Sequence, residues 1–493
     1  MAMHRDLRDW IDVLREQGEL VDVRGASWDL QIGALIEIAC RESKGFPPAL
    51  LFRDIPGYPG DRRVLGAQLV SPKRIAITLG LPTEISNRQE LAAACRRKLA
   101  TMNLVPPALV KTGPVAANVL EGSDVDLLSF PVPRHHELDG GRFIGTAHCV
   151  ITKDPDDGWV NLGTYRCMVL GPDKFALHMS PGRDGRIMRD DKYFRRGEPM
   201  PVAIAMGADP ALWLASISEV PWGTSEYDYA GGLKGEPLEV MPGPRTGLPI
   251  PARAEIVIEG ICYPGELEPE GPFGEWAGYY ANRGLLPVPE PVVHVLGVMH
   301  RDEPILTCAH PAKPPSDLSF PESVFRSATM WDQMEKAGVP GIRGVWCHEV
   351  GGARLFNVVS IEQHYAGHSR QAGMVASQCR SGVYIGRYTV VVDDDIDPSN
   401  LWEVVWAIVT RSNPERSIEI TRWCRSSSAD PAASPYLKDK ESNPTDIYTS
   451  KAIIDACWPY EWRERACPVA QISPGLRKEM SAKWSDVLAN IVR

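Results

Sequence analysis

The middle of the chain, residues 143–299, constrains the fold more than any other part of the sequence. Its apolar runs at 143–152, 254–261 and 292–298 are short, rich in β-branched residues and separated by Gly/Pro turns. Runs of this kind predict strands rather than helices. Because several strands must share one buried face, we expect a β-barrel or a β-sandwich in this region.

Both flanks of this region show helical spacing of apolar residues alternating with short strand-like runs. Before it we expect helices around 7–14, 32–39 and 88–99 with strands at 20–23 and 49–52. After it we expect helices at 322–337, 368–380 and 399–411 and strands at 344–347, 355–361 and 388–392. Five prolines between 237 and 251 predict a long connecting loop. Both flanks are therefore interpreted as α/β structure.

A chain of 493 residues is too long for one compact core. We expect an N-terminal α/β domain over 1–125, a central β-barrel domain over 126–310 and a C-terminal α/β domain over 311–470. Residues 471–493 follow Pro474 with an amphipathic pattern. They are predicted to form a terminal helix that packs against another subunit.

Charge and cysteine content exclude several classes of protein. The net charge of −10, without a basic run interleaved with aromatic residues, argues against nucleic-acid binding. Eleven cysteines without any Cys-x-x-Cys pair predict reduced thiols in the cytoplasm, not a disulfide framework or a zinc cluster. The N-terminus has charges where a signal peptide needs an apolar core, and no run of 18 apolar residues predicts a membrane span.

The segment 266–280 carries Glu270 and Glu275, two carboxylates separated by Gly-Pro-Phe-Gly. Gly271 and Gly274 permit close backbone approaches, and Pro272 stiffens the bend, so we interpret the segment as a tight loop. Aromatic surroundings of this kind can raise the pKa of a carboxyl group into the range of a general acid. An acidic surface turn over packed aromatic rings is an equally good interpretation of this loop alone.

Three further polar segments are informative only in combination. In 159–169, strand alternation would place Asn161, Gly163 and Tyr165 on one face and Arg166 on the other. In 176–186, glycines and arginines could surround an anion, and a surface turn would look much the same. In 225–237, Glu226 and an aspartate offer hard oxygen ligands on what looks like an ordinary strand and turn.

Together these segments resemble the UbiD family of decarboxylases. The resemblance runs from 14–20 through 161–166 and 270–279 to 391–397 and 405–411. It implies an N-terminal α/β domain, a central split β-barrel of flavin-reductase-like type, and a C-terminal α/β domain that ends in a dimerisation helix. The assembly implied is a homodimer or a homohexamer.

The resemblance also implies an activity. This is the reversible, non-oxidative decarboxylation of an aromatic, heteroaromatic or α,β-unsaturated carboxylic acid through a covalent adduct of prenylated FMN. The implied partners are a divalent metal ion, usually Mn²⁺, a K⁺ ion and a flavin prenyltransferase that supplies the cofactor. A flavin oxidoreductase is an alternative, although no Gly-x-Gly-x-x-Gly fingerprint follows a strand. A second alternative is a protein that carries flavin or metal without catalysing a reaction.

Carried over position by position, the family's catalytic group is Arg166, Glu270 and Glu275. Glu275 would donate the proton, while Glu270 and Arg166 would set its charge state and position. The cofactor-binding positions are Asn161, Thr164, Tyr165, Arg166, His178, Met179, Ser180, Arg183, Glu226 and Arg387, the last in place of a lysine.

The metal positions implied are Asn161, Asp184 and Glu226 for the divalent ion, with Asp184 in place of a histidine, and Ser216 for potassium. Three residues near the expected substrate, His310, Lys313 and Phe320, are candidates for specificity. Five further histidines are too loosely spaced in the sequence to predict a metal site, and we expect them to have structural or solvated roles. They are His135, His136, His348, His364 and His368.

Overall fold

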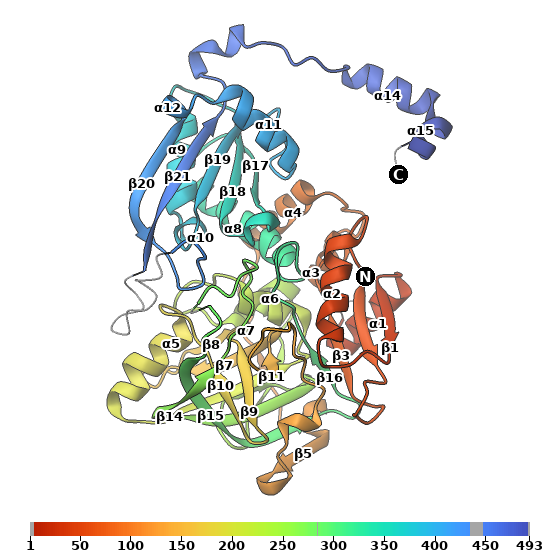
Figure 1. Cartoon of the computed structure of the whole chain (residues 1–493), viewed down its shortest axis with the longest axis vertical. Coiled ribbons are helices and arrows are strands. Elements are labelled where there is room, and N and C mark those ends of the chain that lie inside the picture. Colours follow the sequence, from red (N-terminus) through yellow and green to blue (C-terminus); the bar gives the residue numbers. More distant parts are fainter. Residues whose placement is uncertain (1–3, 283, 434–446, 492–493) are drawn as a thin grey trace.

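The computed structural model describes residues 4–282, 284–433 and 447–491 (Figure 1). Within these residues the strands form four sheets, with helices packed around them. The mixed α/β fold class expected from the sequence is confirmed. Figure 1 places the curled central sheet at the bottom, the N-terminal layer beside it and the C-terminal sheet above it.

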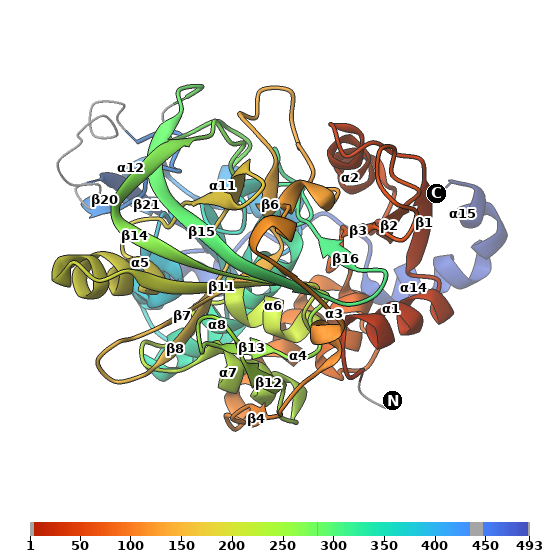
Figure 2. The ribbon, with the colours of Figure 1, turned by 90° about the horizontal axis from the view of Figure 1, so that it is seen from below.

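The central sheet has the strand order β6-β9-β10-β15-β14-β11-β7-β8, with β5 paired to β15, and its pairs are antiparallel. The sheet curls on itself as a half-open barrel (Figure 2), which confirms the expected barrel. Its strands are β5 (Asn118–Glu121), β6 (Phe143–Gly145), β7 (His148–Lys153), β8 (Val160–Gly163), β9 (Cys167–Gly171), β10 (Lys174–Leu177), β11 (Met200–Met206), β14 (Ile256–Glu270) and β15 (Val288–His300).

Both faces of the central sheet are buried along β7, β11 and the first part of β14. Along β11, Ile204 and Met206 enter the large core inside the barrel, whereas Ala203 and Ala205 pack on the opposite face. That opposite face is covered by α6 (Pro210–Ile217) and α7 (Glu226–Lys234). Burial on both faces explains why the sequence shows nearly continuous apolar runs here.

Three interpretations of this region are wrong. The run 159–169 is not one strand, because β8 ends at Gly163 and β9 begins at Cys167. A Cβ at Gly163 would lie 2.3 Å from the Tyr165 ring, so the chain folds back on itself at this point. The segment 225–237 is mainly the helix α7, with Ser225 as its N-cap, and not a strand and turn. Finally, β14 extends through Glu270, so the first third of 266–280 is strand.

The N-terminal layer contains a sheet of order β1-β2-β3-β16. Its strands are β1 (Leu20–Arg24), β2 (Ala49–Arg53), β3 (Arg63–Gly66) and β16 (Ile305–Thr307), and its helices are α1 (Leu7–Glu16), α2 (Gln31–Glu42), α3 (Pro72–Leu79) and α4 (Arg88–Thr101). The expected helices and strands in 7–99 are confirmed. Because β16 returns from far along the chain, this sheet ties the segment before residue 310 to the N-terminal layer.

The C-terminal sheet has the order β17-β18-β19-β21-β20. Its elements are α8 (Ser319–Lys336), β17 (Ile342–Cys347), β18 (Phe356–Ile361), α9 (His368–Gln378), α10 (Arg380–Val383), β19 (Tyr388–Asp393), α11 (Leu401–Arg411), α12 (Pro414–Ser417), β20 (Ile418–Arg425) and β21 (Tyr448–Ala456). The helices and strands expected up to residue 411 are confirmed. Sequence reasoning missed β20 and β21; β20 is an edge strand that is largely exposed and so lacks an apolar pattern.

Two further predictions need correction. The proline-rich stretch 237–251 contains β12 (Glu239–Pro242) and β13 (Pro249–Pro251), which form a small sheet with β4 (Ala108–Leu109). Strands this short and peripheral tolerate proline. The terminal helix is two helices, α14 (Pro474–Lys483) and α15 (Ser485–Ile491), which extend away from the body (Figure 1). Among the helices that the structure describes, none is long and apolar enough to cross a membrane.

Candidate active site

A cavity of about 320 Å³ lies between the curled central sheet and the C-terminal layer. The central sheet and its helices contribute residues from β8 to Arg166, from 178–184, and from the facing ends of α6 and α7. The C-terminal layer contributes residues from α8, α10 and β20. The volume falls in the range of small-molecule sites, about 300–1,000 Å³. Because both layers line it, the cavity depends on how they pack together.

Arg166, Glu270 and Glu275 meet at this cavity, although the sequence separates the arginine from the acids by about a hundred residues. Arg166 Nε and Nη2 donate to the two oxygens of Glu270, each at 2.7 Å. Arg166 Nη1 donates to Glu275 Oε1 at 2.5 Å. The Glu270 side chain is fully buried, whereas Glu275 lines the cavity. Arg166 therefore holds Glu270 through both of its oxygens and Glu275 through one.

The electrostatics of this trio favour the charged arginine. Burial alone would lower the pKa of Arg166, but the two carboxylates outweigh it and hold the pKa above its ordinary value. The guanidinium also lies 5.2 Å from the Phe273 ring centroid. Arg166 is thus a fixed positive charge that keeps two acids close together at the edge of the cavity.

The loop after β14 is built by close packing and backbone hydrogen bonds. Gly140 N–H donates to Pro272 O at 2.8 Å, and a Cβ at Gly140 would lie 1.9 Å from Gly271 O. Only glycine permits that approach. Asp139 accepts from Gly274 N–H at 3.2 Å and from the Tyr280 hydroxyl at 3.0 Å. These contacts fix the loop that carries Glu275.

His178 and Glu290 form a second buried pair beside the trio. His178 Nδ1 lies 2.7 Å from Glu290 Oε1, and ligand atoms of His178, Glu270 and Glu290 all lie within 4.8 Å of one another. Burial alone would raise the pKa of Glu290, but His178 and Arg166 outweigh it and lower that pKa. Sequence reasoning missed Glu290. The available signal was an acid between Pro289 and Pro291 in an apolar strand.

The structure brings the predicted metal positions Asn161, Asp184 and Glu226 to the same cavity. Glu226 accepts from Leu162 N–H at 2.7 Å and has no ion pair with any described residue. Burial raises the pKa of Glu226 to about 8, and Asp184 adds to this rise. Burial also raises the pKa of Asp184. One buried and one half-buried carboxylate, neither in an ion pair with any described residue, together with an amide side chain, fit a hard divalent ion.

Ser216 also lines the cavity, at the end of α6. Its hydroxyl lies 2.9 Å from that of Thr164, and Thr164 Oγ1 in turn donates to His148 O at 2.8 Å. Oxygen atoms of this kind are suitable ligands for a hard monovalent cation. The geometry is thus compatible with the potassium position predicted for Ser216.

Among the predicted cofactor positions, those lining the cavity are Asn161, Thr164, Tyr165, Arg166, His178, Ser180, Arg183 and Glu226. Met179 is buried beneath them in the core. Arg387 does not line the cavity and instead forms an ion pair with the buried Asp430. Arg380 and Arg425 line it from the C-terminal layer, and sequence reasoning missed both. Together with Arg183 they provide positive charge that fits a phosphate group.

The three candidate specificity residues lie outside the lining of this cavity. His310 is buried and lies near His135 and Glu37. Phe320 packs against Phe46, with ring centroids 4.8 Å apart. Lys313 is exposed and lies beside Gly278. The lining residues near their segment are instead Pro311, Leu318 and Glu322.

Comparison with known proteins gives matches along nearly the whole chain. Residues 11–95, 108–314 and 322–456 match the N-terminal, Rift-related and C-terminal domains of the family described as 3-octaprenyl-4-hydroxybenzoate carboxy-lyase, UbiD. Pyrrole-2-carboxylic acid decarboxylase from Pseudomonas aeruginosa is 35% identical over 424 residues, 83% of each chain. Phenolic acid decarboxylase from Bacillus subtilis is 28% identical over 496 residues, 98% of this chain and 99% of that protein.

Solved structures show the same likeness. The UbiD-class enzyme HmfF from Pelotomaculum thermopropionicum in complex with FMN has a TM-score of 0.80 and 30% identity, over 96% of this chain and 98% of that one. An evolved dimeric form of the same enzyme with prFMN has a TM-score of 0.78 over the same shares of the two chains. The likeness therefore extends over the central sheet and the N-terminal and C-terminal layers.

Proposed function

This chain is a carboxy-lyase of the UbiD family, and we propose that it catalyses the reversible, non-oxidative decarboxylation of an aromatic or heteroaromatic carboxylic acid. The observation that carries the proposal is the Arg166–Glu270–Glu275 trio at the wall of the cavity. A cavity with an acid of this kind can return a proton to the carbon that loses carbon dioxide. Relatives that act on pyrrole-2-carboxylic and phenolic acids support an aromatic substrate.

We further propose that the cofactor is prenylated FMN, held through a divalent ion, with Mn²⁺ the expected metal. Arg183, Arg380 and Arg425 would face its phosphate, and Asn161, Asp184 and Glu226 would bind the ion. When bound, the cofactor supplies an electron sink for the charge left by loss of carbon dioxide. A K⁺ ion near Ser216 would complete the polar end of the cavity. Neighbouring structures with FMN and prFMN support the flavin assignment.

The protein's own residues then divide the work of proton transfer. Arg166 holds Glu275 through one oxygen, and Glu275 lines the cavity, so it is placed to carry the proton. Glu270 neutralises part of the Arg166 charge and keeps the guanidinium in one orientation through two hydrogen bonds. His178, oriented by Glu290, provides a ring nitrogen near Ser180 at the same wall.

A substrate panel tests this function. The holoenzyme would be given pyrrole, furan, benzoate, phenazine and cinnamate-type acids in deuterium oxide, with carbon dioxide and product followed together. We expect carbon dioxide release from at least one aromatic acid, and deuterium at the carbon that lost its carboxylate. NAD(P)H consumption without carbon dioxide release would favour a flavin oxidoreductase. Flavin binding with neither outcome would favour a carrier.

We also propose that two copies of this chain associate through the C-terminal layer. The outer side of α11 exposes Trp402 at 86% and Val409 at 70% of their surface, with Val405 and Trp406 beside them. The arm formed by α14 and α15 exposes Leu476, Trp484 and Val487. A second copy would bury both apolar surfaces. Sedimentation of Trp402→Ser with Val409→Ser tests this, because the double variant should sediment as a smaller species than the parent.

Two further proposals concern the source of the cofactor and the location of the protein in the cell. We propose that a flavin prenyltransferase supplies the cofactor, because the cofactor proposed here is a prenylated form of FMN, as in a similar solved structure. We also propose a cytoplasmic location, since all eleven cysteines are free in the structure and reduced thiols persist in that compartment. Whether the assembly grows from a dimer to a hexamer would be measured in the same sedimentation experiment.

A further inference from the structure

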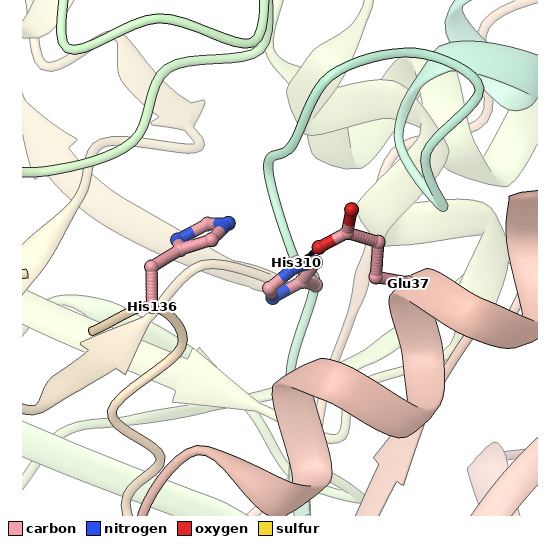
Figure 3. Close-up of side chains that lie close together, drawn as sticks. All are labelled: Glu37, His136 and His310. Atoms are coloured by element: carbon pink, nitrogen blue, oxygen red, sulfur yellow. Dashed lines mark hydrogen bonds and ion pairs between the residues drawn. The ribbon is translucent and has the colours of Figure 1, made fainter. Parts of the chain in front are cut away.

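Glu37, His136 and His310 come together outside the cavity that holds the trio (Figure 3). Glu37 lies on α2, His136 lies in the connection before β6, and His310 follows β16. One ligand atom from each residue lies within 4.8 Å of the other two. The fold therefore gathers two imidazoles and a carboxylate from three distant parts of the sequence.

We propose that these three residues form a second metal site, which binds a divalent transition-metal ion of the Zn²⁺ type. The first argument is the spacing. His310 Nε2 lies 3.4 Å from Glu37 Oε2, which is long for a charge-assisted hydrogen bond of about 2.7–2.9 Å. Ligand atoms on a tetrahedral ion with bonds of about 2.0–2.2 Å lie about 3.3–3.6 Å apart. The observed separation matches an ion bound between the two atoms.

The second argument is that neighbouring groups already orient the ligands. His136 Nδ1 lies 3.3 Å from Asp139 Oδ2, which leaves His136 Nε2 for an ion. His310 Nδ1 lies 3.4 Å from His135 Nδ1, which leaves His310 Nε2 for the same ion. Metal-binding histidines usually donate their second nitrogen to such a group, and a carboxylate is the commonest one. Arg41 donates to Glu37 Oε1 at 2.7 Å, so the facing Oε2 stays available.

The third argument is access. Glu37 and His136 are half-buried, whereas the His310 side chain is almost fully buried. The His136 and His310 rings lie 4.2 Å apart at 34°, and the His136 side chain is partly exposed to solvent. An ion can therefore enter from solvent, bind His310 at the base of the site, and keep at least one water ligand.

The two metal sites of this chain would differ in selectivity. Asn161, Asp184 and Glu226 offer only oxygen atoms, which suit Mn²⁺ or Mg²⁺. Glu37, His136 and His310 offer two nitrogens and one oxygen, which suit Zn²⁺ and related ions. The inference does not rest on the proposed function, because none of its ligands lines the cavity.

An ion in this site would connect the N-terminal layer to the loop that carries Glu275. Asp139, the partner of His136, also holds Gly274 and Tyr280 of that loop. Glu37 lies on α2, in the N-terminal layer. The role we assign to the ion is therefore structural: it fixes α2 and the loop after β14 relative to each other.

The test uses the full-length protein, stripped of metal by a chelator and titrated with Co²⁺ as a spectroscopic substitute for Zn²⁺. A site with two imidazoles and low coordination number gives intense visible absorption, whereas an all-oxygen site gives only weak bands. We expect one intense Co²⁺ site that Zn²⁺ displaces. We expect it to disappear in His136→Gln and in Glu37→Gln and to remain in Glu226→Gln.

A matched control is His294→Gln, which breaks another His–Glu contact, the exposed pair His294–Glu266 at 2.6 Å. This variant should keep the intense site. Asp139→Asn should weaken Co²⁺ binding by about 10–100-fold, the usual effect of losing an orienting group. Zn²⁺ should raise the melting temperature of the parent protein and not that of His136→Gln. Identical Co²⁺ spectra for the parent and His136→Gln, or no intense band in the parent, would overturn the proposal.

Discussion

Exchanging the two glutamates one at a time for glutamine should separate proton transfer from positioning. Glu275→Gln keeps the shape of the side chain and its hydrogen bond from Arg166, now made to an amide oxygen. It removes the proton that a carboxyl group can deliver. Turnover should fall by about 10²–10⁴-fold, as is typical when a general acid is lost. One hydrogen bond is only weakened, so the stability change should stay below about 1.5 kcal/mol.

Glu270→Gln should behave differently, because this side chain is fully buried and accepts two hydrogen bonds from Arg166 at 2.7 Å each. An amide can accept only one of them and would turn its NH₂ group toward the guanidinium. Breaking a buried ion pair costs about 3–5 kcal/mol. Because Glu275 still pairs with Arg166, we expect the lower end of that range, together with a loss of activity.

The assay compares both variants with the parent as holoenzymes, with flavin and metal content measured first. Turnover, thermal unfolding and deuterium incorporation into product would then be recorded. Glu268→Gln is the matched control, since Glu268 pairs with Lys174 at 2.5 Å near the surface of the same strand and should change none of these values. If Glu275→Gln shows near-normal turnover and unchanged deuterium incorporation, another group donates the proton and our reasoning is refuted.

Three further predictions concern metal, pH and specificity. Glu226→Ala and Asp184→Ala should lower the amounts of bound metal and flavin, whereas Asp184→His should preserve both. Elemental analysis measures the metal and absorbance measures the flavin. Unchanged metal content in Glu226→Ala would mean that the metal site lies elsewhere. Burial lowers the pKa of Lys451 from 10.5 to about 8, so the folded chain binds this proton less tightly than the unfolded chain. The free energy of unfolding should therefore rise with pH between about 8 and 10.5. The stability of Lys451→Met, measured by chemical denaturation, should lack that part of the rise with pH. A pH profile identical to that of the parent protein would contradict the prediction. Phe320→Leu should reduce activity equally on all acids, because the ring packs against Phe46 and Trp346 outside the cavity. A change in the relative activity on different acids would mean that Phe320 contacts the substrate.

Local patterns in the sequence identified most elements, because apolar periodicity reports burial directly. Helix α9 and strands β17, β18 and β19 were predicted to within a few residues for this reason. The pattern failed where burial is unusual. Strand β20 is an exposed edge, and the three residues 164–166 interrupt the run 159–169 between β8 and β9 without a proline to mark the break. The Pro-rich strands β12 and β13 are short and peripheral, so their prolines suggested a loop.

The site was predictable where one short segment carries its chemistry. Glu270 and Glu275 flank a single turn, and Asn161 to Arg166 form one run, so both were visible in the sequence. Arg380 and Arg425 were not, because only the packing of the C-terminal layer on the central sheet brings them to the cavity. The same holds for Glu37, His136 and His310, whose separations along the chain give no metal-binding spacing.

The central claim is that this cavity holds prenylated FMN and releases carbon dioxide from an aromatic acid. The most direct measurement is the mass of the flavin bound to protein purified from cells with and without a co-produced flavin prenyltransferase, with carbon dioxide release assayed on each preparation. We predict that the prenylated mass and the activity appear together, and only when the prenyltransferase is present. Full activity with unmodified FMN alone would contradict the account.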